Sequence, residues 1–335
     1  MDSVEIFFCG LLFKLKIYET EGYAFQTLFN NIMTSAFPNF QPIVPWGSAG
    51  DGGNDGYIPS EGKYYQVYGP SIARNNESVV NYAQRKLRDD FFHLKDKWGE
   101  CSTNAPLEHF YFVYNDFFKG IPAPLEEAML NLKEEAALTE GRVLGTFELK
   151  NIFFTLPDHN QIEIVGYLPP TSEIPQYVKA KPIGDLLEYM LKRIDFTSLV
   201  FSSATDAPDV AKKAKYNELS QPIKDYLVRC LRFNSYIDNF AQSSQDQDIL
   251  QAISDFVHKL YLRSKEIVPD DAEDASDLRF VWIVNQIIPP AIRENHHART
   301  SYQVAALVIL SYYFKSCDIY ENPPEEKNEN VEQLS

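Results

Sequence analysis

The feature that most constrains this chain is a glycine-rich stretch at residues 46–70, WGSAGDGGNDGYIPSEGKYYQVYGP. Glycines surround two acids, Asp51 and Asp55, and a second segment, YYQVY, follows a further turn. This pattern predicts a β-hairpin with a glycine-rich entry. Because side chains alternate between the two faces of a strand, Gln66 is expected on the same face as Tyr68.

Two interpretations of this hairpin are open. An acid at the start of a hairpin and a carbonyl oxygen in its second strand can converge on one hard cation, which prefers oxygen ligands. Asp55 and Gln66 occupy those two positions. The alternative is a surface hairpin whose aspartates accept hydrogen bonds from the turn backbone, as Asp commonly does. The spacing alone does not choose between them.

The stretch GDGGNDGY followed by YYQVY resembles the active-site hairpin of PD-(D/E)xK nucleases, in particular the Mrr-like restriction endonucleases. The resemblance implies that Asp55 and Gln66 bind Mg²⁺ or Mn²⁺ and that Asp51 shapes the turn or assists as a ligand. It also implies a lysine two residues after Gln66, where this chain has Tyr68. A tyrosine, with a reference pKa near ~10, is neutral at pH 7 and supplies no cation.

Two further site residues follow from the same resemblance. In some of these nucleases the lysine lies on the helix after the hairpin, and Lys86 is the candidate here; the alternative is an ordinary solvated lysine. A helix before the hairpin often carries a glutamate that completes the metal site. That position is Gln26 in this chain, and Glu21 is the candidate substitute. The alternative for Glu21 is a solvated acid favoured by the helix dipole.

The pattern of segments predicts two domains. In residues 1–168 the predicted elements follow in the order helix, three strands, helix, strand and helix. This order predicts an α/β restriction-endonuclease-like (PD-(D/E)xK) nuclease domain. Residues 169–182 hold several prolines without periodicity, which predicts a linker. Residues 183–321 show only helical periodicity, which predicts an all-α bundle, and residues 322–335 are a polar, acidic tail.

The end of the predicted bundle carries a second resemblance. The stretch AALVILSYYFKSCDIYENP, residues 305–323, resembles the C-terminal domain of effectors in bacterial ABC-three-component systems, which include the Lamassu anti-phage group. It implies docking of the helical domain on an SMC-like ABC ATPase subunit and a small middle subunit, with homo-oligomers on activation. Together the two resemblances imply a Mg²⁺-dependent endonuclease that cuts DNA in an anti-phage or anti-plasmid defence complex.

The net charge of −16 limits how such a chain meets DNA. A protein that coats nucleic acid needs clustered Lys and Arg, so DNA has to be held by a local basic patch, a divalent metal or a basic partner. Two alternatives remain open. The first is a catalytically inactive nuclease-fold adaptor that binds DNA or partner subunits. The second is an acidic DNA mimic, which accounts for the charge and leaves the hairpin unexplained.

The cysteines and the apolar segments bear on location. Four scattered cysteines, with neither a CxxC pair nor histidines at zinc-ligand spacing, indicate reduced thiols. The apolar run at residues 6–13 is too short to span a bilayer and is followed by charge. We therefore expect a cytoplasmic protein without a membrane anchor. The sequence has no GxxxxGK[ST] phosphate loop, so nucleotide hydrolysis is expected of another chain.

Overall fold

The computed structural model describes residues 1–44, 52–71, 77–98, 106–194, 209–243, 248–293, 296–316 and 319–324. The chain forms two compact units. The sheet unit comprises Met1 and Leu12–Tyr167, and the helical unit comprises Asp2–Leu11 and Leu168–Ser335. The division after residue 167 lies next to the boundary expected at residue 168, but residues 2–11 group with the helical unit.

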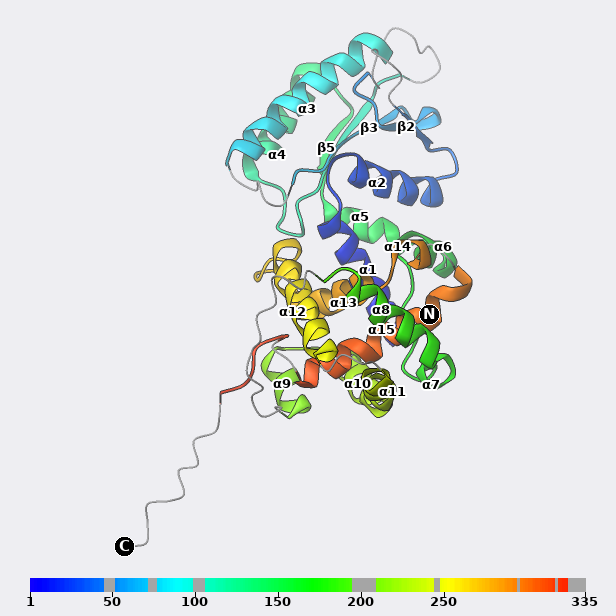
Figure 1. The fold of residues 1–335 in the computed structure, drawn as a ribbon. Helices are drawn as coiled ribbons and strands as arrows, with labels where there is room; N and C mark the ends of the chain where they lie inside the picture. Colours follow the sequence, from blue (N-terminus) through cyan, green and yellow to red (C-terminus); the bar gives the residue numbers. More distant parts are fainter. Residues whose placement is uncertain are drawn as a thin grey trace, which may run out of the picture. The chain divides into compact units, whose positions relative to one another are not determined.

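The sheet unit is built on one five-stranded mixed sheet in the order β1-β2-β3-β4-β5 (Figure 1). Its strands are β1 (Gln41–Pro42), β2 (Gly56–Ile58), β3 (Lys63–Tyr68), β4 (His109–Tyr114) and β5 (Glu140–Leu144). The first three strands pair antiparallel, whereas β3, β4 and β5 pair parallel. The 3₁₀ turn η2 (Pro59–Glu61) joins β2 to β3, so the predicted hairpin is present.

Helices cover both faces of this sheet (Figure 1). The helices of this part of the chain are α1 (Ser3–Glu19), α2 (Gly22–Ala36), α3 (Glu77–Trp98), α4 (Ala123–Ala136), α5 (Thr146–Phe153) and α6 (Asp158–Val165). In Figure 1, α3 and α4 lie on one face and α2 on the other. The expected mixed α/β character is therefore confirmed.

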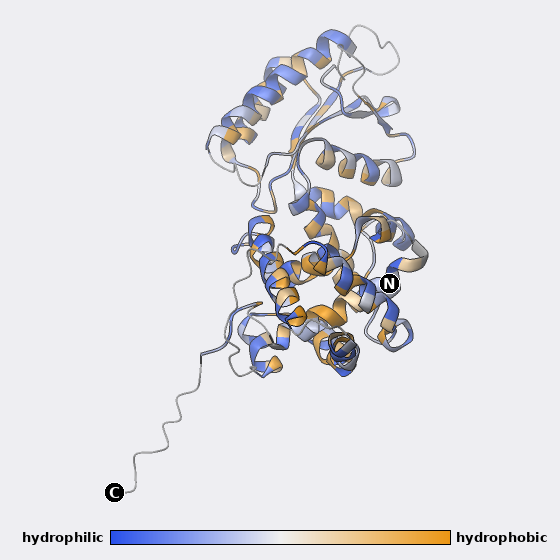
Figure 2. Cartoon of the chain, viewed as in Figure 1, coloured by the Kyte–Doolittle hydropathy of each residue, from blue (hydrophilic) through white to orange (hydrophobic). Residues whose placement is uncertain are grey.

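Helix α3 shows why its sequence is helical. Its buried positions are Val79, Ala83, Leu87, Phe91 and Leu94, spaced three or four residues apart, and they form one apolar stripe. The exposed side is hydrophilic, so α3 alternates between the two colours in Figure 2. Val79 begins this stripe, and its neighbour Val80 is only partly buried.

The main core of the sheet unit lies between the sheet and the helices α3 and α4. After His109, strand β4 consists of aromatic residues and a valine and is fully buried, as expected for a strand covered on both faces. The buried cluster consists of Tyr64, Ala83, Leu87, Phe91, Leu94, Phe110, Phe112, Tyr114, Leu125, Met129, Leu132, Leu138 and Val143.

Every regular element that the structure describes after residue 168 is a helix. The elements are α7 (Ile174–Tyr177), α8 (Ala180–Leu191), α9 (Val210–Tyr216), α10 (Gln221–Cys230), η5 (Leu231–Phe233), α11 (Ser235–Ser243), α12 (Ile249–Ile267), α13 (Ala275–Ile287), α14 (Pro290–Arg293) and α15 (His296–Ser316). Helix α15 contacts α8, α10 and α13, and its residues 303–311 are all buried. It is therefore the central helix of this unit.

The stretch that resembles ABC-three-component effectors is largely core. Tyr313, Phe314 and Ile319 are at most 1 % exposed, and the Tyr320 hydroxyl donates to the Ser276 carbonyl at 2.7 Å. The backbone N–H of Glu321 donates to the Asn217 side chain at 2.9 Å. The pattern of this stretch is thus explained by packing. Cys317 and Asp318 lie outside the described residues.

The segment predicted as a linker, residues 169–182, is packed in the helical unit. It contains α7 and the start of α8, Ile174 is fully buried, and the Tyr226 hydroxyl donates to the Pro169 carbonyl at 2.6 Å. Among the described parts of the chain, no helix has both the length and the apolar character needed to cross a membrane. Cys9 and Cys230 are buried and are not joined in a disulfide, and the other two cysteines lie outside the described ranges.

Candidate active site

Two glycines allow the neighbouring helices to approach the hairpin closely. Gly53 has a φ of +76°, and a Cβ atom there would lie 2.2 Å from the Asp90 carbonyl oxygen of α3. A Cβ atom at Gly69 would lie 2.8 Å from the Cβ atom of Phe25 in α2. The Gly22 N–H, at the start of α2, donates to the Gly69 carbonyl at 2.8 Å. These contacts bring α3 and α2 against the two ends of the hairpin.

Asp55 precedes β2 and is 3 % exposed. Gly56 pairs with Tyr65, so continuing the antiparallel register by one residue places Asp55 opposite Gln66. The Asp55 carboxylate accepts hydrogen bonds from the Val67 N–H at 2.7 Å and from the Gln26 side-chain amide at 2.5 Å. Strand β3 and helix α2 together therefore fix the orientation of this carboxylate.

Gln66 lies in β3 and is also 3 % exposed. Among the described residues, no donor lies within hydrogen-bonding distance of its side-chain oxygen, Oε1, and no acceptor within that distance of the Asn54 side-chain nitrogen, Nδ2. A buried polar atom without a partner costs about 1–3 kcal/mol, so it calls for a ligand, an ion or a water. The site therefore offers one unused acceptor, from Gln66, and one unused donor, from Asn54.

Lys86 reaches this site from α3. Its Nζ atom lies 2.6 Å from the Asp90 carboxylate, and the two side chains are one helical turn apart. Burial alone would lower the pKa of Lys86, but the charge and hydrogen bond of Asp90, together with the charge of Asp55, raise that pKa above its ordinary value. Lys86 is therefore a fixed cation at neutral pH, within electrostatic reach of Asp55.

The donor set at this site suits a hard cation. Within the described ranges, no three His, Cys, Asp or Glu side chains converge as a metal-binding group. The available oxygens are the Asp55 carboxylate and the unpartnered Gln66 amide. Mg²⁺ is commonly bound by one or two protein carboxylates and completes its shell with waters and substrate phosphates. The residues present therefore fit Mg²⁺ or Mn²⁺ held partly by the substrate.

The other predicted site residues have different outcomes. Asp51 lies outside the described residues. Glu21 is the exposed N-cap residue of α2, makes no side-chain capping bond, and is not among the residues bonded to Asp55. Gln26 takes the place at Asp55 instead. The sequence reasoning missed Asp90; the available signal was an acid four residues after Lys86, on the same side of a predicted helix.

Tyr68 occupies the position where the resemblance implies a lysine. Its ring centroid lies 5.6 Å from that of Tyr82 in α3 and 6.0 Å from that of Tyr114 in β4. Burial, and then the neighbouring Tyr68 and Asp116, raises the pKa of Tyr114 to about 12, so this phenol is neutral at physiological pH. The end of β3 therefore presents aromatic rings beside the cation of Lys86.

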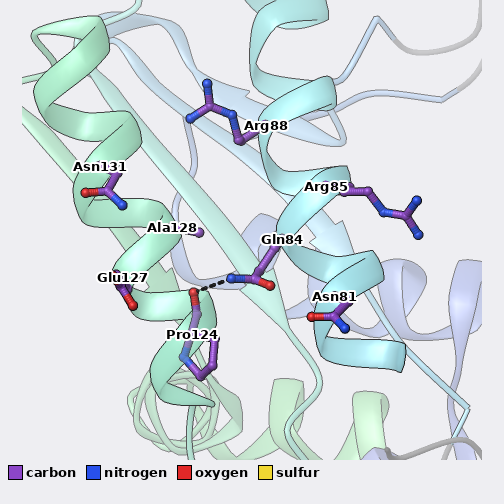
Figure 3. Close-up of a pocket in the computed structure, with 8 residues that line it drawn as sticks. All are labelled: Asn81, Gln84, Arg85, Arg88, Pro124, Glu127, Ala128 and Asn131. Carbon is purple, nitrogen blue, oxygen red and sulfur yellow. Dashed lines mark hydrogen bonds between the residues drawn. The ribbon is translucent and has the colours of Figure 1, made fainter. Parts of the chain in front are cut away.

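A groove lies beside the same helix. This groove between α3 and α4 has a volume of about 520 Å³ (Figure 3). Its lining residues are Asn81, Gln84, Arg85, Arg88, Pro124, Glu127, Ala128 and Asn131. The Gln84 amide donates to the Pro124 carbonyl at 2.8 Å, and Arg88 pairs with Glu135 at 2.9 Å. None of Asp55, Gln66 and Lys86 lines the groove, so it is separate from the candidate active site.

The fold and site together define an α/β protein with a buried Asp–Gln pair and an adjacent lysine at a sheet hairpin. Comparisons with known proteins add no family to this description, because no family model, curated protein or solved structure matches the chain. The function is therefore argued from the geometry of the site.

Proposed function

We propose that this protein is a metal-dependent endonuclease that hydrolyses phosphodiester bonds in DNA. The observation that carries the proposal is the convergence of Asp55, the unpartnered oxygen of Gln66 and the cation of Lys86 on one hairpin. An anionic oxygen donor, a neutral oxygen donor and a fixed cation are the groups that phosphodiester hydrolysis needs to hold a metal and a phosphate.

The order of elements supports a PD-(D/E)xK-like nuclease core. Helix α2 is followed by the antiparallel strands β1, β2 and β3, then by α3 and the parallel strand β4. This is the order expected for that core from the sequence. The hairpin, the preceding helix and the following helix each supply a side chain to the site, namely Asp55, Gln26 and Lys86.

Each residue has a defined role in the proposed chemistry. Asp55 and Gln66 would hold a Mg²⁺ or Mn²⁺, which would supply polarisation of the scissile phosphate and a more acidic bound water. Gln26 and the Val67 N–H keep the Asp55 carboxylate in place. Lys86 stays protonated, so it acts as a cation that stabilises negative charge on the phosphate and not as a general base.

The wider setting that we propose is an effector in a cytoplasmic anti-phage or anti-plasmid complex. An SMC-like ABC ATPase subunit and a small middle subunit would dock on the helical unit, and the effector would form homo-oligomers on activation. Because Tyr313, Phe314 and Ile319 are buried, docking would use other, exposed residues of this unit. The net charge of −16 is in keeping with a nuclease that needs metal or a partner to hold DNA.

A second candidate function is a catalytically inactive adaptor that keeps the nuclease-like fold for binding DNA or partner subunits. The specific observation in its favour is Tyr68, a neutral aromatic residue at the position where the resemblance implies a lysine. In that case Asp55 and Gln66 would bind a structural ion or none.

The experiment that separates the two is plasmid nicking with Mg²⁺ or Mn²⁺, by the chain alone and with its partner subunits. The parent protein and Lys95→Ala, which removes an exposed lysine of the same helix, are expected to cleave. Asp55→Ala is expected to abolish cleavage, and Lys86→Ala to slow it by about a hundredfold or more. If neither the parent nor any variant cleaves the plasmid, even in the activated complex, the result would support the adaptor. Cleavage that survives Lys86→Ala would remove that residue from the mechanism.

A further inference from the structure

The side of α3 that faces the candidate active site carries an exposed aromatic residue. Tyr82 is 50 % exposed and lies one turn before Lys86, about 6 Å along the helix axis. Tyr82 and Asp55 both contribute to the electrostatic environment of Lys86. An exposed ring and the candidate active site therefore share one neighbourhood.

Packing holds the Tyr82 ring in place from one side. Its centroid lies 5.6 Å from that of Tyr68, with the two ring planes inclined at 41°. Tyr68 in turn lies 6.0 Å from Tyr114 and 6.3 Å from Phe112, both of which belong to the buried core. Because Tyr82 rests on a rigid aromatic cluster while half of its surface stays exposed, it loses little conformational freedom when another flat group stacks on it.

We propose that Tyr82 is a stacking platform for an unpaired base of the DNA strand bound at Asp55, so that the preferred substrate is single-stranded DNA or a frayed end. This inference rests on the proposed function and deepens it. With a phosphate held near Lys86, a base of the same nucleotide or of its neighbour comes within reach of Tyr82. In the interior of a duplex both faces of each base are already covered by its neighbours, so away from the duplex ends only an unpaired base can use the ring.

Two other observations fit this substrate. Tyr68 stands where the resemblance implies a lysine. Its ring packs against that of Tyr82, so a tyrosine at this position has a physical role that a lysine would not have. Arg85 is exposed on the next turn of α3; it lines the groove between α3 and α4, and its side chain points away from α4 in Figure 3. An aromatic platform with cations beside it is the combination that binds single strands with little sequence preference.

The test is binding of a fluorescein-labelled oligo(dT) to the full-length chain, measured by fluorescence anisotropy with Ca²⁺ in place of Mg²⁺, so that a divalent cation can help to hold the strand while cleavage is suppressed. The parent is expected to bind oligo(dT) more tightly than a blunt duplex of equal length. Tyr82→Ala is expected to weaken oligo(dT) binding about tenfold, the usual effect of losing one base-stacking ring. Tyr82→Phe keeps the ring and is expected to bind like the parent. Tyr216→Ala, which removes a similarly exposed ring from α9, is the matched control and is expected to change nothing.

A second variant reports stacking directly. Tyr82→Trp is expected to bind oligo(dT) at least as tightly as the parent, and its additional tryptophan emission is expected to be quenched on binding. Any of three results would overturn the inference. The first is equal affinity of the parent and Tyr82→Ala for oligo(dT), and the second is equal affinity of the parent for oligo(dT) and blunt duplex. The third is no binding of oligo(dT) by any form.

The outcomes separate this inference from the proposed function. Metal-dependent cleavage of duplex DNA that is unaffected by Tyr82→Ala would leave the nuclease and remove the stacking platform. If oligo(dT) binding depends on Tyr82 but the protein cleaves no DNA with any metal or partner, the stacking role of Tyr82 stands and the adaptor function is supported.

Discussion

Two buried aspartates of the sheet unit, Asp55 and Asp116, have contrasting surroundings. Asp116 follows β4, and its carboxylate accepts hydrogen bonds from the Thr146 N–H at 2.8 Å, the Thr146 hydroxyl and the Gly120 N–H at 2.8 Å. It thereby ties the loop after β4 to the start of α5. Asp55 is equally buried, but beside it lie the unpartnered oxygen of Gln66 and the cation of Lys86.

The difference teaches how a structural acid is told from a functional one. Burial and hydrogen bonds are common to both residues, so neither property is diagnostic. The neighbours are what differ: Asp116 joins two loops, whereas Asp55 faces a polar oxygen that the protein itself leaves unbonded. Substitutions at the two aspartates should therefore affect different measurements.

The largest expected effect is on stability, at Asp116. Asp116→Ala leaves the Thr146 and Gly120 N–H groups without their acceptor and is expected to lower the free energy of unfolding by about 3 kcal/mol. Asp55→Asn, which keeps an acceptor for the Val67 N–H, is expected to change it by less than about 1 kcal/mol while removing metal-dependent cleavage. Urea denaturation and plasmid nicking on both variants check the contrast. Equal loss of stability in the two variants would contradict the contrast between Asp116 and Asp55.

An intermediate effect is expected at Gln66. Gln66→Glu puts a second carboxylate opposite Asp55, so Mn²⁺ affinity measured by calorimetry is expected to rise about tenfold. Without metal the two buried carboxylates repel each other, and the thermal midpoint is expected to fall. Added Mn²⁺ is expected to restore it. If added Mn²⁺ does not change the thermal midpoint of Gln66→Glu, the side-chain oxygen at position 66 does not face a metal.

The smallest expected effect is the pH dependence contributed by Lys86. Its folded-state pKa is raised above the reference value of 10.5, so the stabilisation by its charge is fully present below about that pH and is lost as the pH rises through the folded pKa. Lys86→Met is expected to cost at most about 1 kcal/mol at neutral pH, and the difference from the parent should shrink in strongly alkaline buffer. Urea midpoints across this range provide the measurement. If the stability difference between the parent and Lys86→Met does not shrink at alkaline pH, the effect comes from packing of the Lys86 side chain and not from its charge.

Local patterns predicted much of the sheet unit. The hairpin followed from its glycines and from the alternation in YYQVY, and α3 followed from apolar residues at helical spacing. Strand β5 was missed because EGRVL combines two charges and a glycine, and its pairing with β4 is decided by tertiary contact. The short helices α6, α9 and α11 were missed as well, since a few turns carry too little periodicity to be recognised.

The candidate site was predictable only in part. Asp55 and Gln66 could be named from the hairpin and from strand alternation, whereas Lys86 could be named only from the resemblance to nucleases. The bond from Gln26 to Asp55 and the proximity of Lys86 to Asp55 depend on how closely α2 and α3 approach the hairpin. That approach is set by contacts at Gly53 and Gly69, which a sequence pattern does not show.

The helical unit is discontinuous in sequence, and this affects any attempt to separate the two halves of the protein. Residues Asp2–Leu11 belong to that unit, and Phe8 lies 5.0 Å from Tyr226 between ring centroids. A fragment cut at residue 168 would thus lose part of its own core and expose apolar surface that promotes aggregation. A chimera that exchanges the sheet unit for another effector should retain the first eleven residues of this chain.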